Sequence, residues 1–399
     1  MKKTLCLIIV IASLFLVSCG EKPQPPEKEV EPYSASMMHA AVELASRVIL
    51  VQTGGLWYYS KADGGSYPFC FNPLCQHKFA DKCPSALFWH SHSLNSQLVY
   101  CEENNRVYIG RGQKIYSTSF DASDLRLECS LGENGDIAEL TYDISYIRNL
   151  RCYKNYIYFI YNNDDTGNNQ VVRYDIKTKQ VQEMTSATDE QIVSYEIASD
   201  YVYFKAVLSD NTMGFYTADM DFNNRKLDEN PIDRSAMQMG MTMDLYDGKY
   251  FHGKDSNEGY FIHDPLTGER TLISTDPRIV NAGMLLAVHD GWMYFCPFDQ
   301  KGKFETMYNS VYRISNDGII EKCFEMPEME ILSLNFAAGG LILNYFGIYI
   351  DGTNKEESTM KGQGFLYFDI DENGKFINPK PIGRQFDDEE LVEYLKGLS

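Results

Sequence analysis

The sequence lacks the short motifs that mark the commonest enzyme classes. Its 399 residues contain no G-x-S-x-G nucleophile elbow, no H-E-x-x-H zinc helix, no phosphate-binding P-loop and no dinucleotide-binding fingerprint. These absences argue against the enzymes that depend on those motifs. A carboxylate site assembled from distant acids remains compatible with the 56 Asp and Glu residues, although no spacing among them indicates one.

Positive charge is also scarce. The chain has 36 Lys and Arg against 56 Asp and Glu, which gives a formal net charge of −20, and its basic residues form no cluster. A nucleic-acid-binding protein needs a basic patch to displace the counterions of the phosphates. We therefore predict no nucleic-acid partner, and we expect the folded part to avoid anionic lipid surfaces.

Long hydrophobic runs are missing beyond the N-terminus. The single one extends from Leu5 to Val17, follows two lysines and leads into Leu16-Val17-Ser18-Cys19. It is too short for a permanent membrane span, which takes about 20 apolar residues, and Ser18 suits a cleavage site. These residues resemble the signal peptide and lipobox of a bacterial lipoprotein. An ordinary secreted protein with a chance cysteine at position 19 is the alternative.

The resemblance implies that residues 1–18 are removed and that the thiol of Cys19 carries a diacylglycerol. Acyl chains would then hold the protein in the cell membrane, on its extracytoplasmic side. Residues 19–35 continue with a run of Glu, Lys and Pro that offers no apolar surface to bury. We expect this segment to be a disordered tether, with a reach of about 20 Å as a flexible coil.

No linker divides the rest of the chain into domains, but the chain consists of repeated units. Pairs of aromatic-rich runs recur seven times, and the second runs lie 42 to 58 residues apart, close to the length of a propeller blade. The first runs are 48–51, 106–109, 156–159, 201–204, 250–251, 292–295 and 341–343. The second runs are 56–59, 114–116, 172–175, 214–216, 259–261, 311–314 and 365–369.

Short β-branched and aromatic runs bounded by Gly, Asp and Asn predict strands, and their nearly continuous apolarity predicts burial on both faces. Stacked blades provide that environment. We predict an all-β fold, a seven-bladed β-propeller over residues 36–385, with eight blades or a pair of β-sandwiches as lesser alternatives. Residues 37–45 are compatible with a short helix or with the strand that completes the ring. Residues 386–399 begin acidic and end with a lysine, which predicts a short C-terminal helix.

Residues 69–84 form the densest group of chemically distinctive side chains. Cys70, Cys75, His77 and Cys83 fall within fourteen positions, and a Cys3His set is a known tetrahedral zinc arrangement. The segment resembles a cysteine and histidine loop that follows the first blade in propeller lipoproteins of unknown function. A structural zinc site with these four ligands is one prediction, and such a closed site would stabilise the loop rather than perform chemistry.

Disulfide bonds are the alternative, because exported proteins commonly pair their cysteines. One such pairing joins Cys75 to Cys83 and Cys70 to Cys101. We expect four other cysteines to be small buried hydrophobic residues: Cys129, Cys152, Cys296 and Cys323. We expect three separate histidines to be structural or exposed: His252, His263 and His289.

The chain as a whole resembles the TolB-like propeller lipoproteins, a resemblance that implies a fold and a location without an activity. We predict a monomeric, membrane-anchored propeller that binds a protein, peptide or glycan, and we favour binding over catalysis. One alternative is an extracytoplasmic polysaccharide hydrolase or lyase with carboxylates in the central channel. A second is metal or redox sensing through the cysteine and histidine loop. Buried acids with perturbed pKa values in the channel would favour the enzyme.

Overall fold

The structure of the protein is a computed structural model. It divides into two units, residues 1–33 and 34–399, and the second is described here. The described residues are 35–36, 41–52, 55–76, 83–85, 98–131, 147–162, 167, 169–186, 190–208, 210–232, 245–255, 258–297, 308–326, 329–349 and 359–382. The predicted signal peptide (1–18), Cys19, nearly all of the tether and the predicted C-terminal helix (386–399) lie outside these residues.

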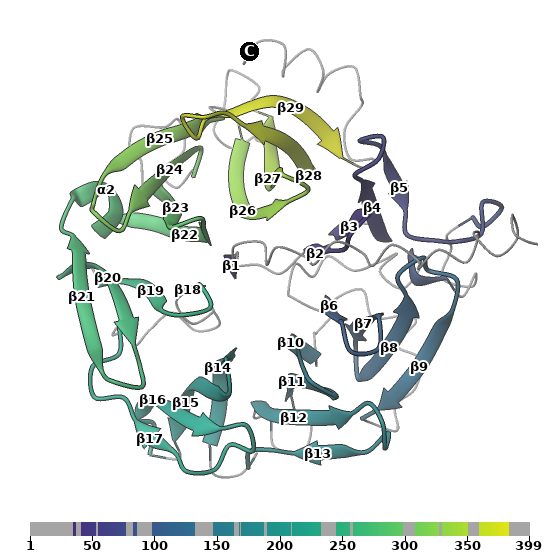
Figure 1. Ribbon diagram of the computed structural model, residues 1–399, viewed down its shortest axis with the longest axis horizontal. Helices are drawn as coiled ribbons and strands as arrows, with labels where there is room; N and C mark the ends of the chain where they lie inside the picture. Colours follow the sequence, from purple (N-terminus) through teal and green to yellow (C-terminus); the bar gives the residue numbers. More distant parts are fainter. Residues whose placement is uncertain are drawn as a thin grey trace, which may run out of the picture. The chain divides into compact units, whose positions relative to one another are not determined.

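Seven antiparallel sheets are arranged in a ring, which confirms the prediction of an all-β, seven-bladed propeller (Figure 1). Each blade is a meander of four consecutive strands, with the first strand nearest the centre. Blade 1 is β2 (Ala41–Glu43), β3 (Arg47–Gln52), β4 (Gly55–Ser60) and β5 (Ser66–Pro68). Blade 2 is β6 (Leu98–Cys101), β7 (Arg106–Arg111), β8 (Lys114–Ser119) and β9 (Leu125–Ser130).

The remaining blades repeat this order. Blade 3 is β10 (Ile147–Tyr153), β11 (Tyr156–Asn162), β12 (Asn169–Asp175) and β13 (Val181–Glu183), and blade 4 is β14 (Glu190–Ala198), β15 (Tyr201–Leu208), β16 (Met213–Asp219) and β17 (Lys226–Leu227). Blade 5 is β18 (Leu245–Tyr246), β19 (Phe251–Asp255), β20 (Gly259–Asp264) and β21 (Glu269–Ser274). Blade 6 is β22 (Ala282–His289), β23 (Trp292–Pro297), β24 (Ser310–Ser315) and β25 (Ile320–Glu325), and blade 7 is β26 (Met329–Ala337), β27 (Gly340–Tyr349), β28 (Thr359–Ile370) and β29 (Phe376–Ile382).

The predicted pairs of runs are the second and third strands of every blade. Six of the seven first runs fall entirely on second strands, the seventh, 250–251, ends on the first residue of β19, and all seven second runs fall on third strands. Successive side chains of a strand point to opposite faces, and here both faces pack against a neighbouring blade. In β11, Ile157 and Phe159 pack toward blade 2, whereas Tyr158 and Ile160 pack toward blade 4.

The described core consists of seven apolar clusters, one at each junction between neighbouring blades. The junction between blades 7 and 1 closes the ring without exchanging a strand, because each of these blades takes its four strands from one stretch of chain. Val48 and Leu50 pack there with Phe365, and the rings of Tyr59 and Tyr367 stack at 4.9 Å. Ring closure therefore depends on side-chain packing.

The sequence left a short helix or a ring-completing strand open for residues 37–45, and the described part of this segment is a strand. Residues 41–43 form β2, which completes blade 1 as its innermost strand and pairs with β3. The strand β1 (Ala35–Ser36) instead pairs with Val288 and Ala287 of β22, as a fifth strand on the inner edge of blade 6.

The two faces of the ring differ in the length of their connections. First-to-second and third-to-fourth strand links emerge on one face and are only two to six residues long; we call this the tight-turn face. The other links emerge on the opposite, long-loop face, and 29 residues separate β5 from β6, 16 separate β9 from β10 and 17 separate β17 from β18. One of these links contains the helix α2 (Pro277–Val280), and no helix among the described residues is long and apolar enough to cross a membrane.

Candidate functional site

The cysteine loop begins directly after β5, on the long-loop face. Both ends of its described part are attached to the same backbone carbonyl. The N–H of Phe69 donates to the carbonyl oxygen of Leu56 at 2.8 Å, and the Ser85 hydroxyl donates to that oxygen at 2.8 Å. Phe69 and Ser85 are both buried. Blade 1 therefore fixes where the loop leaves and where it returns.

A turn at Asn72 shapes the first half of the loop. The Asn72 side chain accepts a hydrogen bond from the N–H of Leu74 at 2.9 Å, and the Asn72 carbonyl accepts one from the N–H of Cys75 at 3.1 Å. An asparagine that bonds to the backbone two residues later is a common turn-forming arrangement. The turn reverses the chain and returns Cys75 toward Cys70.

The structure brings three of the four predicted ligands together. The sulfur atoms of Cys70, Cys75 and Cys83 all lie within 4.8 Å of one another. Cys83 is buried and the other two are half-buried, and burial raises the pKa of the Cys70 thiol. His77 lies outside the described residues, so its part in a Cys3His zinc site stays a prediction.

Two apolar side chains of this loop point into solvent, and the sequence analysis did not single them out. Phe71 is 66 % exposed and Leu74 is 88 % exposed, which makes them the most exposed large hydrophobic side chains among the described residues. From their residue type alone, a phenylalanine and a leucine are expected in the core. The signal in the sequence that could have indicated exposure is their position between Cys70 and Cys75, in a short loop and not in a strand of alternating polarity.

One suggested disulfide pairing is wrong. Cys101 at the end of β6 is bonded to Cys152 in β10, with a Cα–Cα distance of 5.5 Å, so Cys101 is not a partner for Cys70. The bond joins blades 2 and 3. It also corrects the expectation that Cys152 is merely a small buried residue. Cys101 and Cys152 both lie near the end of an innermost strand, whereas the runs that recur visibly in the sequence are the second and third strands.

The remaining strand cysteines behave largely as expected. Cys296 and Cys323 are buried in the cluster between blades 6 and 7, and Cys129 is half-buried. Burial raises the pKa values of the Cys129 and Cys323 thiols to about 12. Such thiols carry little thiolate at neutral pH and are poor nucleophiles.

The histidines predicted to be structural lie inside blades. His263 Nε2 is 2.6 Å from Asp228 Oδ2, and the Tyr203 hydroxyl donates to the same oxygen at 2.7 Å. His252 makes similar contacts with Asp247 and Tyr260, and the ring of His289 stacks on Phe336 at 4.1 Å. His252 and His263 are at most 2 % exposed, so these groups connect strands and are closed to a substrate.

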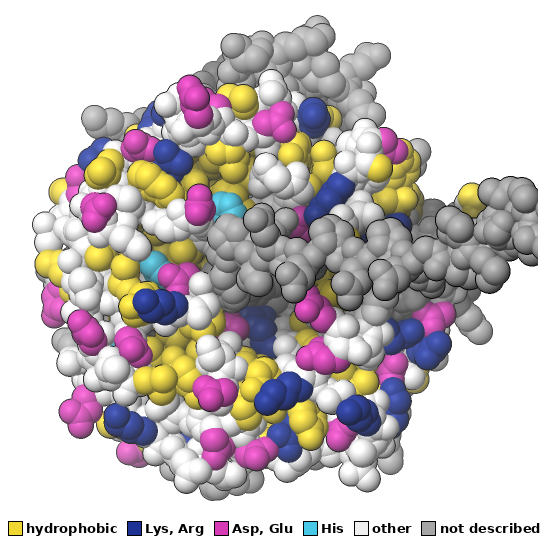
Figure 2. Space-filling view, in the orientation of Figure 1, with side chains coloured by type: hydrophobic (Ala, Val, Ile, Leu, Met, Phe, Trp, Pro, Cys, Tyr) yellow, Lys and Arg dark blue, Asp and Glu magenta, His cyan; other side chains and the backbone are white. Residues whose placement is uncertain are grey.

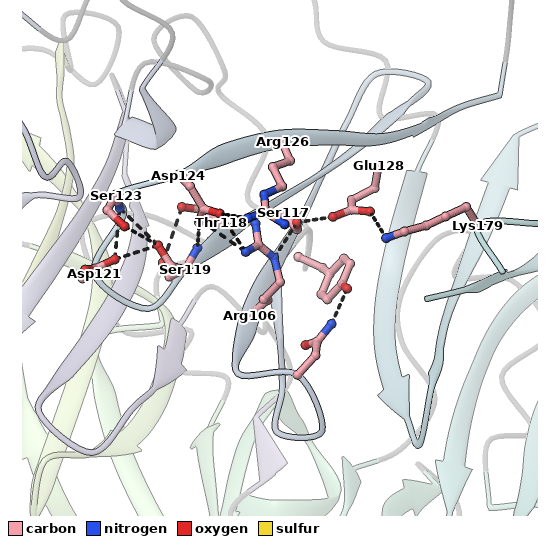
Figure 3. Close-up of polar contacts among 12 residues, drawn as sticks. Arg106, Ser117, Thr118, Ser119, Asp121, Ser123, Asp124, Arg126, Glu128 and Lys179 are labelled. Carbon is pink, nitrogen blue, oxygen red and sulfur yellow. Dashed lines mark hydrogen bonds and ion pairs between the residues drawn. The ribbon is translucent and has the colours of Figure 1, made fainter. Parts of the chain in front are cut away.

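A polar network on blade 2 extends to blade 3 (Figure 3). The Arg106 guanidinium donates to Ser117 Oγ at 2.9 Å and forms an ion pair with Asp124 at 3.0 Å. Burial alone would raise the pKa of Asp124, but hydrogen bonds from Arg106 and Ser119 and the charge of Arg106 lower it to about 2. The acid is therefore ionised throughout the ordinary pH range.

Glu128 is the link between the two blades. Its carboxylate accepts hydrogen bonds from Ser117 at 2.5 Å, from the Tyr174 hydroxyl at 2.8 Å and from Lys179 at 2.6 Å. Burial opposes ionisation, but these three donors hold the pKa of Glu128 below its usual range. With its donors in place, this carboxylate serves as a structural anion rather than as a general acid.

Acids on the inner strands are likewise engaged. Arg151 of β10 and Glu196 of β14 form a two-bonded pair at 2.8 and 2.7 Å, and Glu190 pairs with Arg225 at 2.7 Å. Figure 2 shows basic and acidic side chains beside one another in the hollow at the centre of the ring. Both carboxylates, those of Glu196 and Glu190, are therefore held by guanidinium groups of the neighbouring or the same blade.

A search against family models found no match, and a search of curated proteins also found none. Solved structures with the same fold were found. A puromycin hydrolase S511A mutant complexed with PGG is 11 % identical, with a TM-score of 0.55, over 91 % of this chain and 56 % of that one. An acylaminoacyl peptidase from Pyrococcus horikoshii is 8 % identical, with a TM-score of 0.50, over 90 % of this chain and 54 % of that one.

The chain thus spans about half the length of these two enzymes. The β-propeller domain of the Trilobed protease from Pyrococcus furiosus is 9 % identical, with a TM-score of 0.47, over 88 % of this chain and 99 % of that one. At such low identity, a likeness to the first two structures establishes the fold and nothing about activity.

Proposed function

We propose that the protein is a cell-envelope lipoprotein whose propeller binds a partner protein or peptide through the long-loop face. The observation that carries this proposal is the exposure of Phe71 and Leu74 at 66 % and 88 % on a loop fixed to blade 1. Large exposed apolar side chains on a rigid support are typical of contact surfaces. The aliphatic Leu74 favours a protein or peptide over a glycan, since sugars are held mainly by polar groups and aromatic rings.

The asymmetry of the ring supports the same proposal. Long links leave one face, whereas the opposite face has turns of two to six residues. Loops on a rigid scaffold carry binding residues more often than tight turns do. The lipobox ending at Cys19 supports placement on the extracytoplasmic side of the membrane, and the Cys101–Cys152 bond is in keeping with export.

A paired set of variants tests the binding proposal. The full chain is produced in its host, and partners captured from the envelope fraction by cross-linking are quantified for the native protein, for Phe71→Ser with Leu74→Ser, and for Leu266→Ser with Ile319→Ser. Leu266 and Ile319 are 50 % and 56 % exposed but lie in turns on the tight-turn face. The proposal expects the first pair to abolish capture of a reproducible partner and the second pair to leave it intact.

Equal capture by both variant pairs would contradict the proposed surface. Depolymerisation of an envelope polysaccharide by the purified protein would instead favour the hydrolase or lyase alternative. The anchor is tested separately. Mass spectrometry of the mature N-terminus should find acyl chains on Cys19, and an unmodified thiol there would exclude the lipoprotein assignment.

A further inference from the structure

The three sulfur atoms of the cysteine loop have the spacing that one bound metal ion requires. Zinc binds thiolate sulfur at about 2.3 Å, which places two sulfurs of a tetrahedral site about 3.8 Å apart. The sulfur atoms of Cys70, Cys75 and Cys83 lie within 4.8 Å of one another in all three combinations. A disulfide would join only two of these sulfur atoms, and it would not require the third sulfur to lie close to both of them.

The backbone holds this arrangement in place from both sides. Cys70 follows Phe69, Cys83 lies two residues before Ser85, and Phe69 and Ser85 bond to the same carbonyl of Leu56. Cys75 is returned to the group by the turn at Asn72. A ligand set held by fixed backbone loses less conformational entropy when the ion binds than three cysteines on a loose segment would.

The described residues of the loop, 69–76 and 83–85, have little apolar packing of their own to define their shape. Its first large apolar residue, Phe69, is buried against blade 1, but Phe71 and Leu74 face solvent. Short segments that cannot bury a core are commonly stabilised by a disulfide or by a structural metal. A cross-link at the three sulfurs would hold the exposed pair in one position.

We propose that Cys70, Cys75 and Cys83 bind a single thiophilic cation of the zinc class. Each coordinating thiol releases its proton to solvent, and the thiolates then share the ion, with no change in the oxidation state of sulfur or metal. Three sulfur ligands favour zinc or another soft d10 ion over magnesium or calcium, which prefer oxygen. This inference concerns the loop alone and does not depend on the proposed binding function.

Cobalt substitution is the direct test. The full chain, purified in detergent with a reductant, is titrated with Co²⁺ and then with Zn²⁺. We expect a thiolate-to-cobalt charge-transfer absorption that saturates at one ion per chain and disappears as zinc displaces the cobalt. Cys70→Ser and Cys83→Ser should weaken zinc binding at least about 100-fold, and Cys129→Ser, on β9, should leave it unchanged.

Two variants are needed because replacing the buried Cys83 puts folding at risk, whereas Cys70 is half-buried. Circular dichroism of each variant checks that the sheets remain. Absence of the charge-transfer absorption in the native protein overturns the proposal, and so does equal zinc affinity in Cys70→Ser and Cys129→Ser. A disulfide joining any two of the three cysteines in protein isolated without a reductant and without bound metal also overturns it.

Discussion

Different contacts hold neighbouring blades together at two junctions of the ring, the one between blades 2 and 3 and the one between blades 7 and 1. Both bury apolar side chains, but the first adds the Cys101–Cys152 bond and the Glu128 network. The second joins the two ends of the ring and relies on packing and on Glu43, which accepts the N–H of Ala338 at 2.8 Å. The point where the ring closes is thus the less strongly connected of the two.

This difference shows that a propeller does not need its strongest link at the point of closure. Every blade buries both faces, so opening any junction exposes two apolar surfaces at once. Packing alone is sufficient at the closing junction as long as it is complete. We therefore expect defects in packing there to have larger consequences than the loss of any single polar contact.

The largest effect is expected from Phe365→Ala. Phe365 is 1 % exposed in the closing cluster, and truncating a buried phenylalanine typically lowers the free energy of unfolding by about 3–5 kcal/mol. Chemical denaturation measures the loss, and amide hydrogen exchange should show it concentrated in blades 7 and 1. Leu272→Ala, at a side chain 51 % exposed, is the control and should change stability by less than about 0.5 kcal/mol.

The matching change at the other junction is Phe159→Ala, at a fully buried position. With the disulfide intact, exchange should remain slow near Cys101 and Cys152 even though the global stability falls. If both variants lose protection equally around their junctions, the proposed difference between the junctions is wrong.

The next largest effect is expected from Cys152→Ser. The disulfide closes a loop with a sequence separation of 51 residues, and removing a cross-link of that kind lowers the free energy of unfolding by about 2–4 kcal/mol. Denaturation under oxidising conditions measures this loss. In the presence of a reductant the variant and the native protein should become nearly equal, and a difference that persists would point to packing instead.

Glu128→Gln should have a smaller and pH-dependent effect, about 1–2 kcal/mol at neutral pH, because three donors lose their charged acceptor. The pKa of Glu128 is lowered in the folded protein, so its contribution is present above the pKa of the unfolded chain and is lost as the pH falls through the folded value. Stability measured from pH 7 down to pH 3 should therefore decline less steeply in the variant. If the free energy of unfolding falls equally steeply with pH in both proteins, protonation of Glu128 does not contribute to the acid sensitivity.

The smallest effect is expected from Glu43→Gln at the closing junction. The Glu43 side chain is 29 % exposed and also pairs with Lys61, so solvent weakens both contacts. We expect a loss of about 0.5 kcal/mol in the free energy of unfolding, below that of Glu128→Gln. A larger loss than at Glu128 would reverse the ranking of polar contacts at the two junctions.

The sequence was most informative where burial is two-sided. Second and third strands, such as β11 and β12, are apolar on both faces because both contact neighbouring blades, and this made all seven pairs visible. The fourth strands β13 and β17 have only three and two residues, all solvent-exposed, so they leave no apolar run in the sequence. Innermost strands such as β10 mix half-buried polar residues with buried apolar ones, which conceals their period.

The site could be predicted only in part for a similar reason. The spacing of Cys70, Cys75 and Cys83 reveals a local cluster, because residues close in sequence can meet through a turn. Cys101 and Cys152 meet only because their blades are neighbours in the ring, which requires knowing the innermost strands. The exposure of Phe71 and Leu74 depends on how the loop is tied to Leu56, and no periodic pattern records that.

The pairing of β1 with β22 has a mechanical consequence. Ala35 and Ser36 find their strand partners only in Ala287 and Val288, some 250 residues later in the chain. During synthesis these two residues must therefore wait until most of the polypeptide has been made before they acquire a partner. If Cys19 is the lipid anchor and the propeller holds the proposed partner, a pull between the two would reach the propeller first through this short edge pairing on blade 6, and would load it before any junction between blades.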